Sequence, residues 1–168
     1  MRGVFAYAMK HFNKDKVIGV EVGVNLGLNA FEHLVVYPNL EMHLVDNYTR
    51  FRQGSPYMDD TKDWMVYVLA PFKDRITFHF KDSVEAANDL ADNSVDFVYI
   101  DASHDYNNVK KDITAWTPKV RKGGIIGGHD FYTGKFMMAN GVAAAVVRKF
   151  PGEEISHTRA GGDWWVKL

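Results

Sequence analysis

The chain has 168 residues, of which 46% are apolar and 24% are charged, the composition of an ordinary globular protein about one domain long. Its 20 basic and 21 acidic residues leave a formal net charge of -1, so no strong positive field is present to hold nucleic acid or an anionic membrane. The absence of cysteine excludes disulfides and thiolate chemistry, so any metal must be bound by oxygens or imidazoles.

The sequence predicts a single domain over residues 1–168. No repeat, low-complexity segment or linker-like stretch interrupts it. The first residues contain no apolar stretch long enough for a signal peptide, and no segment approaches the roughly eighteen apolar residues of a membrane span. We therefore expect a cytoplasmic protein with no nucleic-acid or membrane partner.

Short apolar runs typical of strands alternate along the chain with segments of helical spacing. Strands are expected at 17–23, 42–47, 75–82, 95–101, 123–130, 153–159 and 163–168, and helices at 28–37, 61–72, 83–90, 107–120 and 141–150. The turn at 160–162 is too short for a parallel crossover, so the last two strands should form an antiparallel hairpin. The expected fold class is α/β, with a Rossmann-like doubly wound sheet of seven strands, mostly parallel.

A glycine-bearing turn follows the first predicted strand and opens a helix. It runs from Glu21 as EVGVNLG, so Asn25 replaces the middle glycine of the pattern G-x-G-x-x-G. Gly23 and Gly27 would let a ligand approach the backbone, and the helix start offers free N–H groups. The turn predicts a cofactor site at the carboxyl edge of the sheet, where ligands bind in such folds; a packing turn is the alternative.

Polar residues after the second and third predicted strands extend this site. Asp46 lies nineteen positions after Gly27, close to the separation at which an acidic residue binds ribose hydroxyls. Asp82 and Ser83 follow the third strand, where an adenine edge would be met. The structural alternatives are that Asp46 caps the following loop and that Ser83 caps the next helix.

Acidic residues also follow the fourth and fifth predicted strands. Asp101 and Asp130 at adjacent strand ends would bind one hard cation through their oxygens. Such a cation lowers the pKa of a substrate hydroxyl, and His104 is placed to take the proton, because the unperturbed pKa of histidine is about 6.5. We predict Asp101, His104 and Asp130 as the catalytic residues. The alternative is that the aspartates cap nearby segments and the histidine is a surface residue.

These residues make the chain resemble the class I S-adenosylmethionine-dependent methyltransferases over nearly its whole length. The terminal antiparallel hairpin separates that family from NAD-binding domains. The resemblance implies S-adenosylmethionine as cofactor, with its methionine beside the glycine turn, its ribose on Asp46 and its adenine near Asp82. The predicted cofactor-binding residues are Glu21, Gly23, Asn25, Gly27, Asp46, Asp82, Ser83 and Asp101.

The E-x-G-x-x-x-G form of the turn is similar to that of small metal-dependent O-methyltransferases, of the catechol type and of the macrocin and mycinamicin type. The resemblance implies that Asp101 and Asp130 bind magnesium and that His104 is the general base. Phe131 stands where the catechol type has asparagine, so His129 is the candidate for the third ligand, with a contact to the substrate as the alternative. A histidine ligand would favour manganese, iron or zinc over magnesium.

Two loops flank the expected mouth of the site and would cover an apolar or sugar-like acceptor, with ordinary packing as the alternative. Their candidate residues are Tyr48, Arg50, Phe51, Arg52 and Tyr57 in 47–60, and Tyr132, Phe136, Met137 and Met138 in 131–140. Trp164 and Trp165, on the closing hairpin, are expected in the core and at the sheet edge.

The leading hypothesis is a divalent-metal-dependent methyltransferase acting on a hydroxyl of a small molecule. Two alternatives stay open: a metal-independent methyltransferase with His104 as base, and a non-catalytic module that binds a nucleotide or S-adenosylmethionine. No N-P-P-Y type motif follows the fourth strand, which argues against methylation of DNA or glutamine. The acceptor and a homo-oligomeric assembly are open questions.

Overall fold

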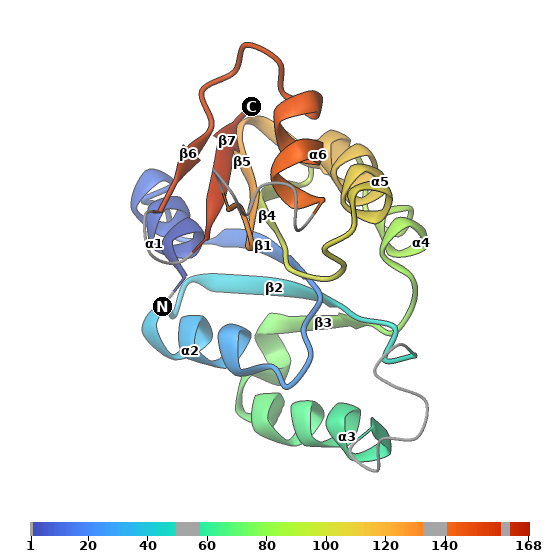
Figure 1. Ribbon diagram of the computed structural model, residues 1–168. Helices are drawn as coiled ribbons and strands as arrows, with labels where there is room; N and C mark the ends of the chain where they lie inside the picture. The colour runs from blue at the N-terminus through green and yellow to red at the C-terminus, as the bar shows by residue number, and fades with distance from the viewer. Residues whose placement is uncertain (1, 50–57, 133–140, 159–161) are drawn as a thin grey trace.

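The computed structural model describes residues 2–49, 58–132, 141–158 and 162–168. A central sheet has the strand order β3-β2-β1-β4-β5-β7-β6 (Figure 1). Its strands are β1 (Val17–Val22), β2 (Leu40–Val45), β3 (Ile76–His79), β4 (Val95–Ile100), β5 (Val120–Gly128), β6 (Ser156–His157) and β7 (Trp164–Lys167). The first five are parallel, and β7 pairs antiparallel with β5 and β6, which confirms the predicted fold class.

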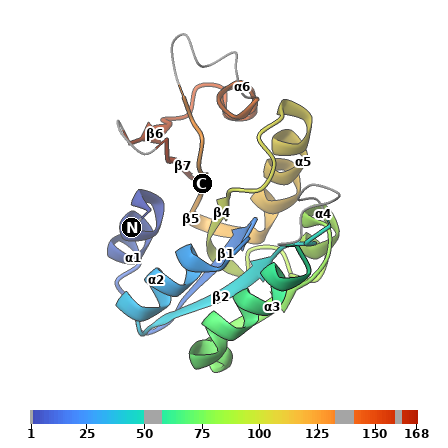
Figure 2. The same cartoon turned by 60° about the horizontal axis from the view of Figure 1, so that its bottom comes forward.

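Helices cover both faces of this sheet (Figures 1 and 2). They are α1 (Gly3–His11), α2 (Leu28–Val36), α3 (Met58–Leu69), α4 (Ser83–Ala87), α5 (Tyr106–Trp116) and α6 (Val142–Lys149), with 3-10 turns η1 (Ala70–Arg75) and η2 (Thr117–Lys119). One core cluster joins α1, α2 and α3 to the sheet, and a second joins α4, α5 and α6 to it. Among the described helices, none has the length and apolarity to cross a membrane.

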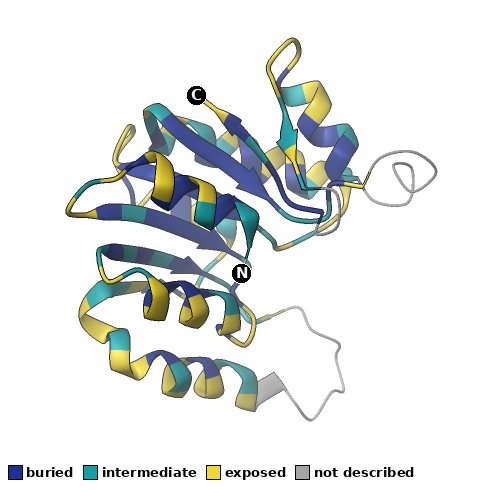
Figure 3. Ribbon diagram, turned by 90° about the vertical axis from the view of Figure 1, so that its left-hand side faces the viewer, coloured by how far each residue is buried: buried dark blue, intermediate teal, exposed yellow. Residues whose placement is uncertain are grey.

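Burial follows this layering (Figure 3). All six residues of β4 are buried, whereas α2 and α3 leave exposed residues on their outer sides. Alternate residues of β4 point into opposite cores, since Phe97 packs with the α1 side and Val98 with the α5 side. This is the pattern expected of a strand covered on both faces.

Several element boundaries differ from the sequence-based expectation. Helix α1 was not predicted at all. The helices expected to reach 72 and 120 end at Leu69 and Trp116, because Pro71 and Pro118 stop the α-helical hydrogen bonding and 3-10 turns follow. The helix expected over 83–90 ends at Ala87, and the strands expected over 75–82 and 153–159 keep only four and two residues.

The order of the strands reverses between β1 and β4. Val22 at the end of β1 pairs with Val45 of β2 and with Ile100 of β4, so three strands end level at one edge. The loops after these strands therefore lie side by side at the switch point, where open α/β sheets bind their ligands.

Candidate active site

A cavity of about 920 Å³ opens at this carboxyl edge. It is lined by residues that follow β1, β2, β3 and β4, and by residues of α5. The predicted cofactor residues on its wall are Glu21, Gly23, Asn25, Asp46, Asp82, Ser83 and Asp101. Gly27 belongs to the same turn but is not among the lining residues.

The glycine turn after β1 has left-handed backbone at three positions. Gly23 has φ 92°, and a Cβ atom there would lie 2.3 Å from the backbone oxygen of Asp101, so only glycine fits. Asn25 has φ 51°, a conformation that asparagine adopts more readily than most residues. This tolerance explains why the turn forms without the middle glycine of the usual pattern.

Asp46 fixes this turn to the end of β2. Its Oδ2 accepts hydrogen bonds from the backbone N–H groups of Val24 and Asn25, at 3.0 and 2.9 Å, and its Oδ1 accepts one from Tyr48 at 2.9 Å. The capping role considered from the sequence is therefore present. Because Asp46 also lines the cavity, a ribose-binding role is compatible with it.

Glu21 is a buried acid at the end of β1. Its Oε1 accepts a hydrogen bond from the Asn29 side chain at 2.8 Å, while its buried Oε2 has no partner among the described residues. Burial raises the pKa of Glu21 to about 8; the Asn29 hydrogen bond opposes this, and the nearby Asp101 adds to it. An unpaired buried oxygen facing a cavity is suited to a ligand that brings a positive charge.

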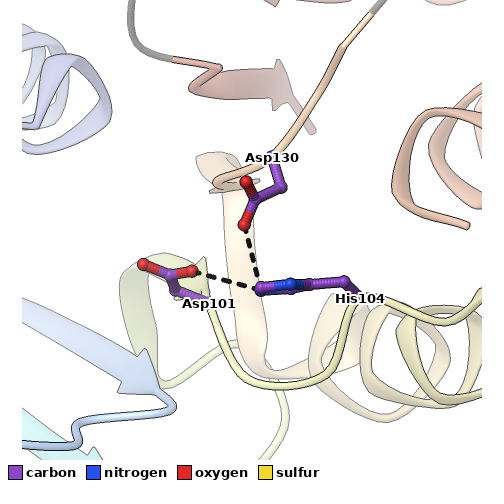
Figure 4. A group of neighbouring side chains, drawn as sticks. All are labelled: Asp101, His104 and Asp130. Carbon is purple, nitrogen blue, oxygen red and sulfur yellow. Dashed lines mark ion pairs between the residues drawn. The ribbon is translucent and has the colours of Figure 1, made fainter. Parts of the chain in front are cut away.

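Asp101, His104 and Asp130 converge beside this cavity (Figure 4). The His104 Nε2 lies 2.9 Å from Asp130 Oδ2 and 3.8 Å from Asp101 Oδ1. One ligand atom from each residue lies within 4.8 Å of the others, a spacing suited to one metal ion. Asp130 has φ 59°, an uncommon backbone conformation that places its carboxylate beside the loop after β4.

His129, the predicted third ligand, lies beside the same carboxylates. Its Nδ1 is 3.3 Å from Asp130 Oδ2 and 4.0 Å from Asp101 Oδ1, whereas its Nε2 is 4.0 Å from Asp163. Among the described residues, the group whose ligand atoms lie within 4.8 Å of one another contains His104, and not His129, beside the two aspartates. Burial raises the pKa of Asp101, and the charges of His129 and Arg2 oppose that shift.

Neither Asp101 nor Asp130, the two predicted catalytic aspartates, caps a described helix. The N-cap of α5 is Asp105, whose carboxylate accepts from the Asn108 N–H at 3.1 Å, and the N-cap of α6 is Gly141. The capping alternative for Asp101 and Asp130 therefore has no counterpart at these two helices.

Arg2 and Asp163 belong to the site but were missed from the sequence. Arg2 Nη2 lies 3.3 Å from Asp101 Oδ2, and its Nη1 lies 4.0 Å from Asp163. The buried Asp163 accepts hydrogen bonds from the Tyr99 hydroxyl at 3.1 Å and from the Gly3 N–H. Because Arg2 and Asp163 are far apart in the sequence, no local pattern indicates that they lie close together.

The predicted adenine end of the cavity contains a third missed residue. Asp82 Oδ1 accepts from the Val84 N–H at 2.9 Å and so caps α4, while Ser83 Oγ accepts from the indole of Trp116 at 2.9 Å. Asp112 of α5 lines the cavity beside them, and burial raises its pKa to about 6. The sequence signal for Asp112 was an acidic residue among the apolar positions on one side of α5.

Other predicted residues are placed only in part. Arg50, Phe51, Arg52, Tyr57, Phe136, Met137 and Met138 lie outside the described residues. The Tyr48 hydroxyl donates to the Asn25 carbonyl at 2.9 Å, a packing role, and Tyr132 is exposed. Trp164 is fully buried and Trp165 is partly buried, as expected from the hairpin.

Residues 20–131 match a family described as methyltransferase domain. No curated protein matches the chain. The matched segment runs from the strand that carries Glu21 to the residue after Asp130, so it contains every predicted site residue.

Solved structures show where the same fold occurs. A protein from Corynebacterium glutamicum is similar with a TM-score of 0.70 and 14% identity, over 98% of this chain and 77% of its own. CalS11, a TDP-rhamnose 3'-O-methyltransferase of calicheamicin biosynthesis, has a TM-score of 0.68 and 18% identity, with coverages of 98% and 77%. A Staphylococcus aureus protein assigned as a caffeoyl-CoA O-methyltransferase has a TM-score of 0.69 and 13% identity, with coverages of 100% and 84%. These identities show the fold alone.

Proposed function

The chain belongs to the family of methyltransferase domains, and we propose that it transfers the methyl group of S-adenosylmethionine to a hydroxyl oxygen of a small molecule. One observation carries the proposal: a single cavity joins the glycine turn, Asp46 and Ser83 to Asp101 and His104. A cofactor and the group that reacts with it would thus meet in one space.

The acidic residues at one end of this cavity favour a cofactor with cationic groups there, because a bound cation would lower the raised pKa of Glu21 and pair with its carboxylate. S-adenosylmethionine carries a sulfonium and an ammonium group, and the described residues at the end of β1 offer Glu21 with its unpaired Oε2 and the nearby Asp101. Arg2 at the same end would meet the cofactor carboxylate. The resemblance stated from the sequence puts the methionine part in this place.

The proposed transfer is a displacement at carbon. A substrate hydroxyl oxygen attacks the methyl carbon, the carbon–sulfur bond breaks with its electron pair left on sulfur, and S-adenosylhomocysteine leaves. The His104 Nε2–H faces Asp130 Oδ2 at 2.9 Å, so the hydroxyl proton goes to the other ring nitrogen, Nδ1, and Asp130 stabilises the imidazolium that forms. Asp101, whose Oδ1 lies 3.8 Å from the same Nε2, adds to this stabilisation.

The same residues fit a divalent ion. Two carboxylates and an imidazole with ligand atoms within 4.8 Å of one another form a donor set of oxygen and nitrogen, so Asp101, Asp130 and either His104 or His129 would hold the ion. When bound, such an ion would lower the pKa of the substrate hydroxyl. His104 would then act as base only where His129 completes the ligand set.

A metal-independent reaction is the second candidate, and a specific contact favours it. Arg2 is paired with Asp101 at 3.3 Å, and the His104 ring lies 2.9 Å from Asp130, so side chains of the protein itself already face both carboxylates. In that case Asp101 would position Arg2 and the loop after β4, and His104 would act alone.

The test is methyl transfer from radiolabelled S-adenosylmethionine to a panel of catechols and deoxysugar nucleotides, with metal-free protein in the presence and absence of Mg²⁺ or Mn²⁺. Activity restored by a metal supports the metal-dependent reaction. Full activity in excess chelator supports the metal-independent one. Binding of S-adenosylhomocysteine without transfer to any hydroxyl acceptor would instead favour a non-catalytic binding module.

A further inference from the structure

Arg2 places a permanent positive charge against one of the two aspartates that would hold a metal ion. Its Nη2 lies 3.3 Å from Asp101 Oδ2, and 34% of its side chain is accessible. A guanidinium group stays protonated at every pH at which proteins are folded. A second cation that binds to Asp101 must therefore either tolerate this charge or displace it.

The two oxygens of Asp101 face different partners (Figure 4). Oδ1 lies 3.8 Å from His104 Nε2 and 4.0 Å from His129 Nδ1, so it is turned toward the possible ligand atoms. Oδ2 is turned toward Arg2. A metal ion that used both oxygens would take the place of the guanidinium, and an ion on Oδ1 alone would lie close to its charge.

The site is shielded enough from water for this charge to affect a bound ion. The side chains of Asp101 and Asp130 are only 20% and 16% accessible. Salt and water therefore screen charges here less than at an open surface. A guanidinium and a divalent ion that share Asp101 would repel one another.

Asp163 offers Arg2 a second carboxylate. Its Oδ1 lies 4.0 Å from Arg2 Nη1, and its Oδ2 accepts a hydrogen bond from the backbone N–H of Gly3. The hydroxyl of Tyr99 also donates to Asp163, at 3.1 Å. Because Gly3 follows Arg2 directly, the backbone contact holds this part of the chain beside the site. The guanidinium can thus leave Asp101 while the start of α1 stays in place.

We infer that Arg2 competes with a divalent ion for Asp101: the guanidinium weakens the binding of the ion, and a bound ion turns the guanidinium away from Asp101 toward Asp163. This inference rests on the metal-dependent form of the proposed function. It gives Asp101 two alternative partners, Arg2 in the metal-free protein and the ion in the loaded protein. The two candidate reactions then differ in which cation faces Asp101.

Titration of the metal-free protein with Mn²⁺, followed by the electron paramagnetic resonance signal of the free ion, tests the inference without cofactor or acceptor. Arg2→Met removes the charge and keeps an unbranched apolar stem, so this variant should bind Mn²⁺ at least about tenfold more tightly than the unaltered protein. Arg2→Lys keeps the charge and should bind Mn²⁺ within about threefold of the unaltered protein.

Two further variants control for net charge and for the place of binding. Lys16→Met also removes one positive charge, but Lys16 is exposed, pairs with Glu41 at 2.7 Å and does not line the cavity, so the Mn²⁺ affinity should not change. Asp130→Asn combined with Arg2→Met should lose the tight binding, because Asp130 belongs to the same group of possible ligands.

A measurement on the unaltered protein covers the case in which Arg2→Met does not fold. The side-chain N–H signals of Arg2, assigned by their loss in Arg2→Lys, should move in ¹⁵N spectra when Mg²⁺ is added at a concentration that displaces Mn²⁺. The signals of Arg148, which donates to the Tyr106 hydroxyl, should stay in place.

The outcomes separate the inference from the proposed function. Equal Mn²⁺ affinities of the unaltered protein and folded Arg2→Met would overturn the inference, as would Arg2 signals that stay in place while the ion binds, and the metal-dependent reaction would stand in both cases. An equal gain in Lys16→Met would reduce the effect to net charge and overturn it too. If Mn²⁺ binds neither the unaltered protein nor Arg2→Met, the metal-dependent form of the function fails together with the inference.

Discussion

The Nε2 end of the His104 imidazole faces two carboxylates, and the ring is still half exposed. Its Nε2 faces Asp130 at 2.9 Å, and 51% of the side chain is accessible. A residue in this position is open to a substrate proton on one side and to a stabilising charge on the other. Whether the site can take a proton from a substrate, or can only bind a ligand, depends on this contact.

Replacing His104 with alanine should lower turnover by roughly 10²- to 10⁴-fold, because the hydroxyl proton loses its acceptor. Binding of S-adenosylhomocysteine should change little, since the cofactor contacts argued above remain. Initial rates and calorimetric titration of the same preparation measure both effects. His11→Ala is the matched control, because His11 is exposed and contacts the carbonyl of Gly123, in the first half of β5 and away from the strand end that precedes Asp130. A variant with normal turnover would remove His104 from the mechanism.

Among the elements, α1 is connected to the site through the residues at its start. Its first residue and the preceding Arg2 both reach Asp163, which lies just before β7 and also accepts from Tyr99 of β4. Three segments that are distant in sequence are thus joined by one buried carboxylate. The position of Arg2 over Asp101 depends on this junction.

Asp163→Asn should lower the free energy of unfolding by roughly 1–3 kcal/mol, because a buried charged acceptor is replaced by a neutral amide that leaves its donors poorly paired. Tyr99→Phe removes a single donor from the same junction and should cost less, about 0.5–1.5 kcal/mol. Urea unfolding followed by circular dichroism measures both. The junction has no role in stability if Asp163→Asn unfolds at the same urea concentration as the unaltered protein.

The sequence predicted the strands more completely than the helices. The apolar runs of β1, β2, β4 and β5 form a local pattern, and all four were located. Helix α1 was missed because Arg2 at its start makes no side-chain cap and Gly3 is a poor helix former, so no local start signal exists. Its burial comes from packing on strands made much later in the chain.

The residues of the site differ in the same way: some have a local signal in the sequence and others do not. Glu21 lies near the end of β1, and three aspartates follow their strands: Asp46, Asp101 and Asp130. These four could be found from their positions in the sequence. Arg2 and Asp163 could not, because they meet only after the sheet has formed. Asp112 could have been recognised from the sequence, because it interrupts the apolar stripe of Val109, Ile113 and Trp116 on α5.

At the scale of the whole molecule, Glu21 should make stability depend on pH. Burial raises the pKa of Glu21 from 4.5 to about 8. Between these values the folded protein holds a proton that the unfolded chain releases, so the free energy of unfolding falls as pH rises from 4.5 to about 8. The stabilisation is fully present below this window and lost above it.

Glu21→Gln stays neutral at every pH and should lack this decline, so the stability difference in its favour should grow by up to about 1.4 kcal/mol per pH unit within the window. Urea unfolding of both proteins across the window measures it. Glu41→Gln is the matched control, because Glu41 lies on β2 and pairs with Lys16 at 2.7 Å. Parallel curves for the unaltered protein and Glu21→Gln would show that burial does not hold the proton.

The docking of α1 also bears on how the chain is made. Phe5 of α1 packs edge-on against Phe97 and Tyr99 of β4, more than ninety residues downstream. At the usual speed of synthesis a ribosome needs roughly 5 to 20 s to add that stretch. During that interval the apolar side of α1 has no sheet to cover it. A nascent-chain chaperone that binds short apolar segments would therefore find a binding site in α1, and should release it once β4 has emerged.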